Sequence, residues 1–258
     1  MTLRFQRFQL AQALTSVIPC RRFRRLATVA FCSVLFTFEV MGQSPVDSTL
    51  TRLLGTDPCT FALGLEKHRP SAISQDLKAR ILNSLPVEGE VKKLKQPAQH
   101  KLNSLQQILR AYQRQSVYEI KVIAVPQAFV GLHGRAVILI SNTALGLLDA
   151  EELQALVAHE IGHEYVWAQY EAARDLNDRH RLQELELYCD GVAILTLGHV
   201  GLDPSRLVTG LEKAGRFNRK RFGKALNEDY YPPFTERREF AQAVTAWAAG
   251  SLLRHCCV

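Results

Sequence analysis

The sequence predicts an α+β fold that is mostly helical, with a small antiparallel β-sheet beside one central helix. Hydrophobic residues make up 47% of the 258 residues, which is enough to bury a sizeable core. Two short runs rich in β-branched residues lie close together at 118–125 and 135–141, and each is typical of a strand. The longer segments around them carry apolar residues at helical spacing, so helices are expected to dominate.

The first 42 residues differ in composition from the rest. They hold six Arg and a single acidic residue, and residues 26–38 form an uncharged, mostly apolar run of thirteen. A membrane-spanning helix needs about 20 apolar residues, whereas the apolar region of a signal peptide needs about 7–15. Val40 and Gly42 place small residues before a cleavage point. We therefore expect a signal peptide over 1–42 and export to the periplasm or the medium. The alternatives are an uncleaved anchor over 26–41, which would attach the protein to a membrane, and a mitochondrial transit peptide.

The net charge of +7 is concentrated in that N-terminal segment. Outside it, 26 basic and 24 acidic side chains nearly balance, so no nucleic-acid partner is expected. The basic run 213–224 is expected to be solvated surface. Beyond the N-terminal segment, Cys59, Cys189, Cys256 and Cys257 form no CxxC motif, which excludes a zinc ribbon. A disulfide of Cys59 with Cys256 or Cys257 is left open.

Residues 43–97 are expected to form a linker and a helical N-terminal extension. Pro, Gly, Thr and Asp are frequent over 43–70, which predicts a linker with one short helix at 47–54. A second helix is expected between Ser74, which can cap it, and Pro86, which ends it.

The main domain is expected over residues 98–255 and begins with a helix at 98–115. The predicted strands at 118–125 and 135–141 follow. They are joined by a loop that contains Gly131, and they are expected to pair antiparallel.

The central helix is predicted by its first residues and by an apolar stripe. Asp149, followed three residues later by Glu152, has the arrangement of a capping box. No Pro interrupts the segment before about Arg174. We therefore expect one uninterrupted helix from Asp149 onward.

His159, Glu160 and His163 in this helix form an HExxH motif. Histidines four residues apart share one helix face, so both imidazoles can reach one metal ion while Glu160 points beside it. This is the geometry of a zinc-activated water next to a general base. We therefore predict a zinc site at the two histidines, with Glu160 as the catalytic base.

A second helix, expected over 182–197, places two carboxylates four residues apart on one face. These are Glu186 and Asp190, and carboxylates in so apolar a segment are costly to bury unless they are paired or bind a metal. A Glu on a following helix is the usual third protein ligand beside HExxH, so Glu186 is the candidate. Asp190 is expected to accept the free ring N–H of a ligating histidine. Two further helices, beginning near Asp203 and Thr235, complete the chain.

The second predicted strand is where we expect a substrate backbone to bind. A sheet edge beside a metal site can hold an extended peptide by adding it as a strand. On that reasoning the candidate substrate-binding residues are Val137, Ile138, Leu139 and Ile140.

Together these motifs resemble the zinc metallopeptidases of the HtpX and BepA type, the group that also contains the CAAX prenyl endopeptidases and the mitochondrial peptidase Oma. The resemblance covers nearly half of the chain and rests on the VILIS strand, on Glu152–Glu164 and on the ExxxD pair. It implies a zincin-like domain of the gluzincin kind with one Zn²⁺ per chain. It assigns His159, His163 and Glu186 to the zinc and Glu160 to the base.

The sequence departs from the family pattern at two places. Gln127-Ala128-Phe129 stands where the family usually has Asn-Ala-Phe, and Tyr231-Pro232 stands where it usually has His-Pro before the Arg at 237. The family histidine is often assigned to transition-state contact or self-inhibition. Tyr231 is therefore a candidate catalytic residue that could donate to an oxyanion instead.

The resemblance predicts a zinc endopeptidase that acts on protein or peptide substrates, with cell-envelope proteins as the expected targets. No apolar run of spanning length follows residue 41, which sets the chain apart from the HtpX type with its several membrane spans. The alternative is a chaperone-like or scaffold protein of the envelope that keeps the zinc fold with little or no proteolysis. Tyr231 and the basic run 213–224 support that alternative. The oligomeric state is not predicted by the sequence.

Overall fold

The computed structural model describes residues 44–55, 57–85, 89–223 and 230–255. The predicted signal peptide at 1–42 and the cysteines at 256 and 257 lie outside these residues, so the leader and the disulfide stay predictions. Within the described ranges, no helix is both long enough and apolar enough to span a bilayer.

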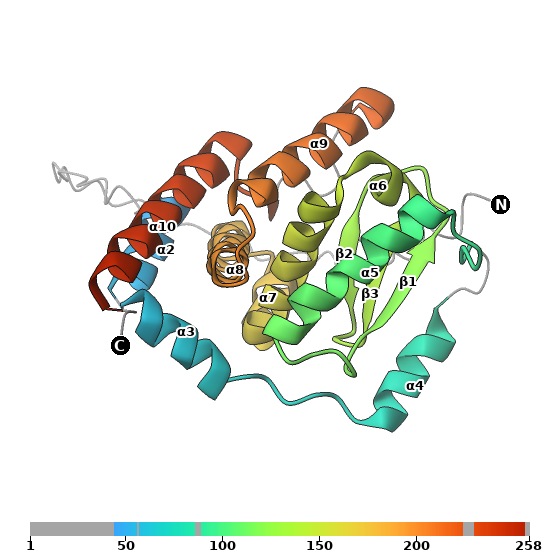
Figure 1. The fold of residues 1–258 in the computed structure, drawn as a ribbon, viewed down its shortest axis with the longest axis horizontal. Coiled ribbons are helices and arrows are strands. Elements are labelled where there is room, and N and C mark those ends of the chain that lie inside the picture. Colours follow the sequence, from blue (N-terminus) through green and yellow to red (C-terminus); the bar gives the residue numbers. More distant parts are fainter. Residues whose placement is uncertain (1–43, 56, 86–88, 224–229, 256–258) are drawn as a thin grey trace, which may run out of the picture. The chain divides into compact units, whose positions relative to one another are not determined.

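The three strands follow one another in the middle of the chain, and helices precede and follow them (Figure 1). In chain order they are α2 (Pro45–Leu54), α3 (Pro58–Lys67), α4 (Gln75–Ser84), α5 (Gln96–Ala111), β1 (Glu119–Ile123), β2 (Val130–His133), β3 (Val137–Ser141), α6 (Asn142–Leu147), α7 (Ala150–Asp175), α8 (Arg179–His199), α9 (Ser205–Phe222) and α10 (Phe234–His255). The predicted α+β class, mostly helical with a small sheet, is confirmed.

The sheet is mixed, with strand order β1-β3-β2. The predicted antiparallel pairing of 118–125 with 135–141 is wrong, because β1 and β3 run parallel. The cause is the segment expected as a loop: residues 130–133 form β2, which folds back antiparallel onto β3. The three residues 134–136 join them, with φ of 58° at both Gly134 and Arg135. Since β2 takes one side of β3, β1 must pair on the other side.

This order corrects the prediction for Val137–Ile140. These residues lie in β3, the central strand, whose backbone pairs with β1 on one side and β2 on the other. A central strand has no unpaired edge, so it cannot accept a substrate backbone. The outer side of β1 is covered by residues 89–91, where Val91 N–H donates to Val122 O (2.8 Å). The sheet edge left for a peptide is β2.

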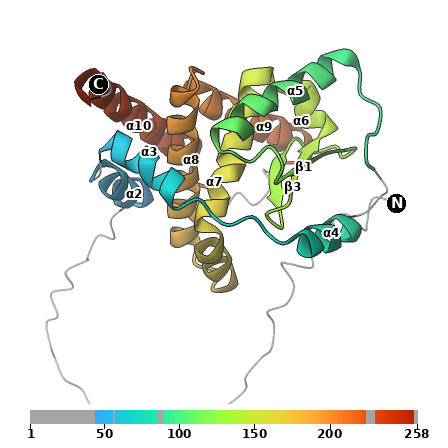
Figure 2. The ribbon, with the colours of Figure 1, turned by 60° about the horizontal axis from the view of Figure 1, so that its bottom comes forward.

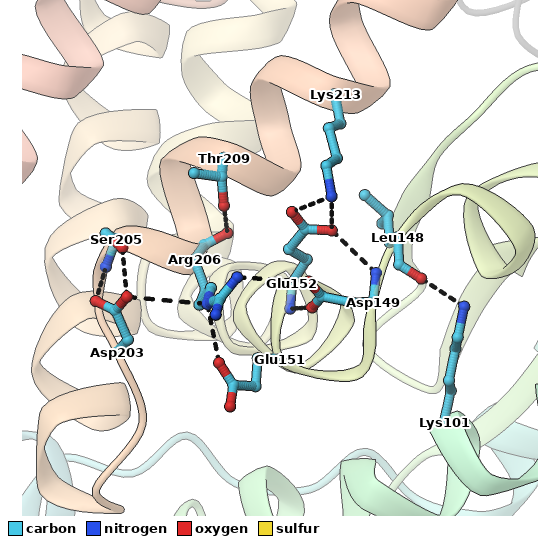
Figure 3. Close-up of polar contacts among 10 residues, drawn as sticks. All are labelled: Lys101, Leu148, Asp149, Glu151, Glu152, Asp203, Ser205, Arg206, Thr209 and Lys213. Atoms are coloured by element: carbon cyan, nitrogen blue, oxygen red, sulfur yellow. Dashed lines mark hydrogen bonds and ion pairs between the residues drawn. The ribbon is translucent and has the colours of Figure 1, made fainter.

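Helix α7 is the element against which most others pack. Its capping box is present, with Asp149 accepting from Glu152 N (2.8 Å) and the Glu152 carboxylate accepting from Asp149 N (2.9 Å). Lys213 of α9 binds the same carboxylate, and Arg206 of α9 binds Glu151 (2.9 Å) (Figure 3). These contacts fix the start of α7, so the motif in its middle stands on a rigid helix.

One hydrophobic core joins α5, the sheet, α7, α8, α9 and α10. Its largest fully buried side chains include Leu105, Ile138, Ile161 and Phe240, each 0% exposed. The central strand and α7 therefore share one apolar interior, and polar side chains on the inner faces of α7 and α8 must find partners there.

The described residues of the segment 44–70 form two helices, where a linker with one short helix was expected. It forms α2 and α3, each started by a capping side chain, Ser44 or Asp57, and by a Pro in the first turn. Helix α2 packs on α8 and α10, and Figure 2 shows α2 and α3 beside these helices, away from the sheet. The Pro and Asp residues that predicted a linker therefore include residues that begin these helices.

Candidate active site

His159 and His163 project from the middle of α7 into the space facing α8. Both are buried, at 3% and 9% exposed. Their ligand nitrogens and a Glu160 carboxylate oxygen all lie within 4.8 Å of one another. The two histidines share a helix face, as their spacing predicts.

Glu186 of α8 lies opposite the two histidines. Its Oε2 is 3.2 Å from His159 Nε2, and its Oε1 is 3.6 Å from His163 Nε2. The side chain is fully buried, with one oxygen facing each imidazole. Two imidazole nitrogens with one carboxylate are a donor set typical of zinc. These residues therefore fit a zinc ion.

His159 is oriented by a chain of buried charges. Its Nδ1 lies 2.8 Å from Asp190 Oδ1, and because an ionised carboxylate only accepts, Nδ1 carries the proton. This leaves Nε2 as the nitrogen that faces Glu186. Arg237 of α10 in turn binds both oxygens of Asp190, through Nε (2.7 Å) and through a terminal nitrogen (2.5 Å).

Glu160 is partly buried and contacts the sheet edge. One oxygen, Oε2, accepts from the backbone N–H of Leu132 in β2 (2.8 Å). Burial raises the pKa of Glu160 to about 7, with the neighbouring Glu186 adding to the rise and His159 opposing it. A carboxylate with a pKa near neutrality is suited to take and return a proton.

The metal-free histidines differ in protonation. Burial alone would lower the pKa of His159, but the hydrogen bond to Asp190 and the neighbouring Glu186 carboxylate outweigh it and raise the pKa to about 10. Burial lowers the pKa of His163 to about 4. A proton therefore stays on His159 in the metal-free protein, and a metal must displace it.

Two tyrosines border the site. The Arg237 guanidinium carbon lies 5.9 Å from the centroid of the Tyr231 ring. Burial, with Glu186 and Glu160 nearby, raises the pKa of Tyr231, so its hydroxyl stays protonated and able to donate. The Tyr170 ring packs edge-to-face on His163, with centroids 4.9 Å apart.

The structure brings together most of the residues singled out in the sequence. His159, Glu160, His163, Glu186 and Asp190 form one cluster. By contrast, Val137–Ile140 lie in the central strand, away from the sheet edge that Glu160 contacts.

Three residues of the site are not predicted by the sequence. Tyr170 follows His163 by seven positions, two helical turns on the same face, which is a signal that spacing carries. Arg237 enters the sequence prediction only as the Arg that follows Tyr231-Pro232 in the family pattern, with no role assigned to it. Leu132 acts through its backbone N–H, and no side-chain pattern can reveal that contact.

Taken together, a mixed sheet whose edge contacts the HExxH helix, two histidines and a buried carboxylate from the next helix define a metallopeptidase of the zincin-like kind. Residues 92–209 match the family model described as Peptidase family M48, over a little under half of the chain. This segment is therefore similar to the M48 metallopeptidases, which are zinc-dependent. No curated protein matches the chain.

Proposed function

We propose that this protein is a zinc-dependent endopeptidase, with His159, His163 and Glu186 as the zinc ligands. The observation that carries the proposal is the Glu186 carboxylate. It is fully buried, and its two oxygens lie 3.2 Å and 3.6 Å from the Nε2 atoms of His159 and His163. A cation is what would compensate it.

Zinc, when bound, supplies Lewis-acid polarisation of the substrate carbonyl and lowers the pKa of a water molecule. Glu160 would take the proton of the attacking water and pass it to the leaving amine. The Leu132 N–H holds one Glu160 oxygen, which leaves the other to exchange the proton. Tyr231, protonated and close to the cluster, would donate to the oxyanion.

An extended substrate would pair with β2. The N–H of Leu132 is directed at Glu160, so this side of β2 faces the catalytic base rather than β3. A peptide added along this edge would lie with its backbone beside Glu160. Recognition through the backbone favours extended segments of protein or peptide chains as substrates.

Export to the cell envelope belongs to the same proposal. It is supported by the Arg-rich start of the chain and by the apolar run over 26–38. The expected substrates are then envelope proteins, and an uncleaved N-terminus would hold the enzyme at a membrane.

The test combines metal analysis with cleavage of an unfolded protein substrate. Wild-type protein should hold about one zinc per chain. Glu160→Gln should keep the zinc and lose cleavage, while Glu186→Ala should lose the zinc. Full cleavage by Glu160→Gln would refute the mechanism. Complementation of a deletion strain by Glu160→Gln would instead support the chaperone-like alternative.

A further inference from the structure

Asn218 forms a clamp on one backbone residue beside the active site. It lies in the basic, mostly exposed second half of α9, yet it is only 5% exposed itself. Its Oδ1 accepts from Ala128 N (2.9 Å), and its Nδ2 donates to Ala128 O (2.8 Å). Both backbone groups of Ala128 are thus satisfied by a single carboxamide.

Ala128 leads directly into β2. The next residue, Phe129, accepts from Ser141 N through its carbonyl (3.0 Å) and donates its N–H to Ser141 Oγ (3.0 Å). The start of β2 is therefore held from two sides, by Asn218 of α9 and by the end of β3.

The other end of β2 is held from α7. Arg135, in the turn after β2, lies 3.4 Å from Glu164, the residue that follows His163. The Glu164 side chain is fully buried and also binds Arg114 (3.0 Å) and the Tyr118 hydroxyl. The strand is thus fixed at both ends.

Between these two anchors lies Leu132, whose N–H meets Glu160. A four-residue strand on a sheet edge has a strand partner on one side only, so its order depends on the anchors at its ends. If its start were released, the unpaired edge would lose the fixed geometry on which a peptide backbone pairs, and binding would have to order it first.

We infer that Asn218 is a positioning residue for the peptide substrate: its clamp on Ala128 holds β2 in the place where the substrate backbone pairs. This inference rests on the proposed endopeptidase function. It predicts an effect on the binding of extended peptides, whereas a purely structural role predicts an effect on stability alone.

The test compares Asn218→Ala with a matched control, Gln154→Ala. Gln154 is also a buried carboxamide, 3% exposed, and donates to a backbone carbonyl, Ser104 O (2.8 Å), between α7 and α5. Two substrates are used: a peptide long enough to pair along β2, and a short blocked peptide that carries only the residues flanking the cleaved bond.

For Asn218→Ala we expect KM for the long peptide to rise about tenfold, with kcat within about twofold, because two hydrogen bonds that fix the binding edge are lost. The short peptide should change little. Gln154→Ala should also lose stability, but it should leave KM unchanged for both peptides. Equal effects of Asn218→Ala on the two peptides, or no effect on the long one, would overturn the inference.

Hydrogen exchange on the metal-free protein gives a readout that does not require activity. Asn218→Ala should speed exchange of the amides over 128–133 by about tenfold and leave those of β1 unchanged. Unchanged exchange over 128–133 would show that Asn218 does not anchor β2. If zinc-loaded wild-type protein cleaves no peptide, the proposed function fails and the substrate role fails with it, while the exchange result still decides the anchoring.

Discussion

The spacing of α7 and α8 depends on Gly162, which lies between the two histidines of the motif. A Cβ added at Gly162 would lie 3.1 Å from Cys189 Cα and 3.2 Å from Cys189 O. Both are backbone atoms of α8 and cannot rotate away. In Gly162→Ala the two helices must therefore separate by a few tenths of an ångström.

This separation acts on the proposed zinc ligands, because Glu186 lies on α8 three residues before Cys189 and the histidines lie on α7. Zinc sites tolerate ligand distances within about 0.2 Å of their normal values. We therefore expect zinc affinity to fall about ten- to a hundredfold, the range seen when supporting contacts of a metal site are altered. The effect on stability should be small, since overpacking costs about 1–3 kcal/mol and replacing a helical Gly by Ala returns about 1 kcal/mol.

The assay is competition for zinc with a chromophoric chelator, together with thermal unfolding of the metal-free protein. The matched control is Gly198→Ala, because Gly198 is also in α8 and a Cβ there would meet nothing within 4 Å. It should keep the zinc affinity and gain about 1 kcal/mol. Unchanged zinc affinity in Gly162→Ala would refute the spacing argument.

Three further predictions concern the groups around the site. Arg237→Met leaves the Asp190 carboxylate buried without its cation, so the free energy of unfolding of the metal-free protein should fall by about 3–5 kcal/mol in urea titrations; a loss below about 1 kcal/mol would contradict the role of this pair. The pKa of His159 is raised to about 10 in the metal-free protein, above its ordinary value of 6.5, so His159 is protonated at pH 7–9 and zinc must displace the proton. Zinc affinity should therefore rise with pH over this range, by up to about tenfold per pH unit, and calorimetry in buffers of different ionisation enthalpy should detect the released proton; binding at pH 8 without proton release would count against it. Tyr231→Phe should retain zinc and lower kcat about a hundredfold with little change in KM, as expected for loss of an oxyanion donor, whereas an unchanged kcat would leave Tyr231 a packing role only.

The parts of the site that the sequence predicts are those set by local geometry. The capping box at Asp149 and Glu152 and the four-residue spacings of His159 with His163 and of Glu186 with Asp190 depend on one helix each. A helix fixes which residues share a face, so the pattern determines the arrangement within it. How α8 meets α7 follows only from their packing, in which the absence of a side chain at Gly162 is decisive.

The sheet was predicted less well because strand pairing is not local. The segment 130–133 is short and contains Gly131 and His133, so it lacks the β-branched alternation of a typical strand. Its strand conformation comes from pairing with β3 and from anchors on α7 and α9, which no window of sequence contains. Missing it reversed the predicted direction of β1 and placed the sheet edge on the wrong strand.

The buried carboxylates among the described residues differ in the kind of cation that pairs with them. Four of them are matched by cations at hydrogen-bond or ion-pair distance: Glu152 by Lys213, Glu164 by Arg114 and Arg135, Glu184 by Arg181, and Asp190 by Arg237. Glu186 is matched differently: the cation closest to it is the protonated His159, with Nε2 3.2 Å from Oε2, while Arg237 is 4.0 Å away and bound to Asp190. In the metal-free protein Glu186 is therefore paired through the proton on His159, and a metal that displaced this proton would take over that pairing. This difference supports Glu186 rather than Asp190 as the proposed zinc ligand on α8: Asp190 is bound by both Arg237 and His159, whereas the two Glu186 oxygens face the two histidines.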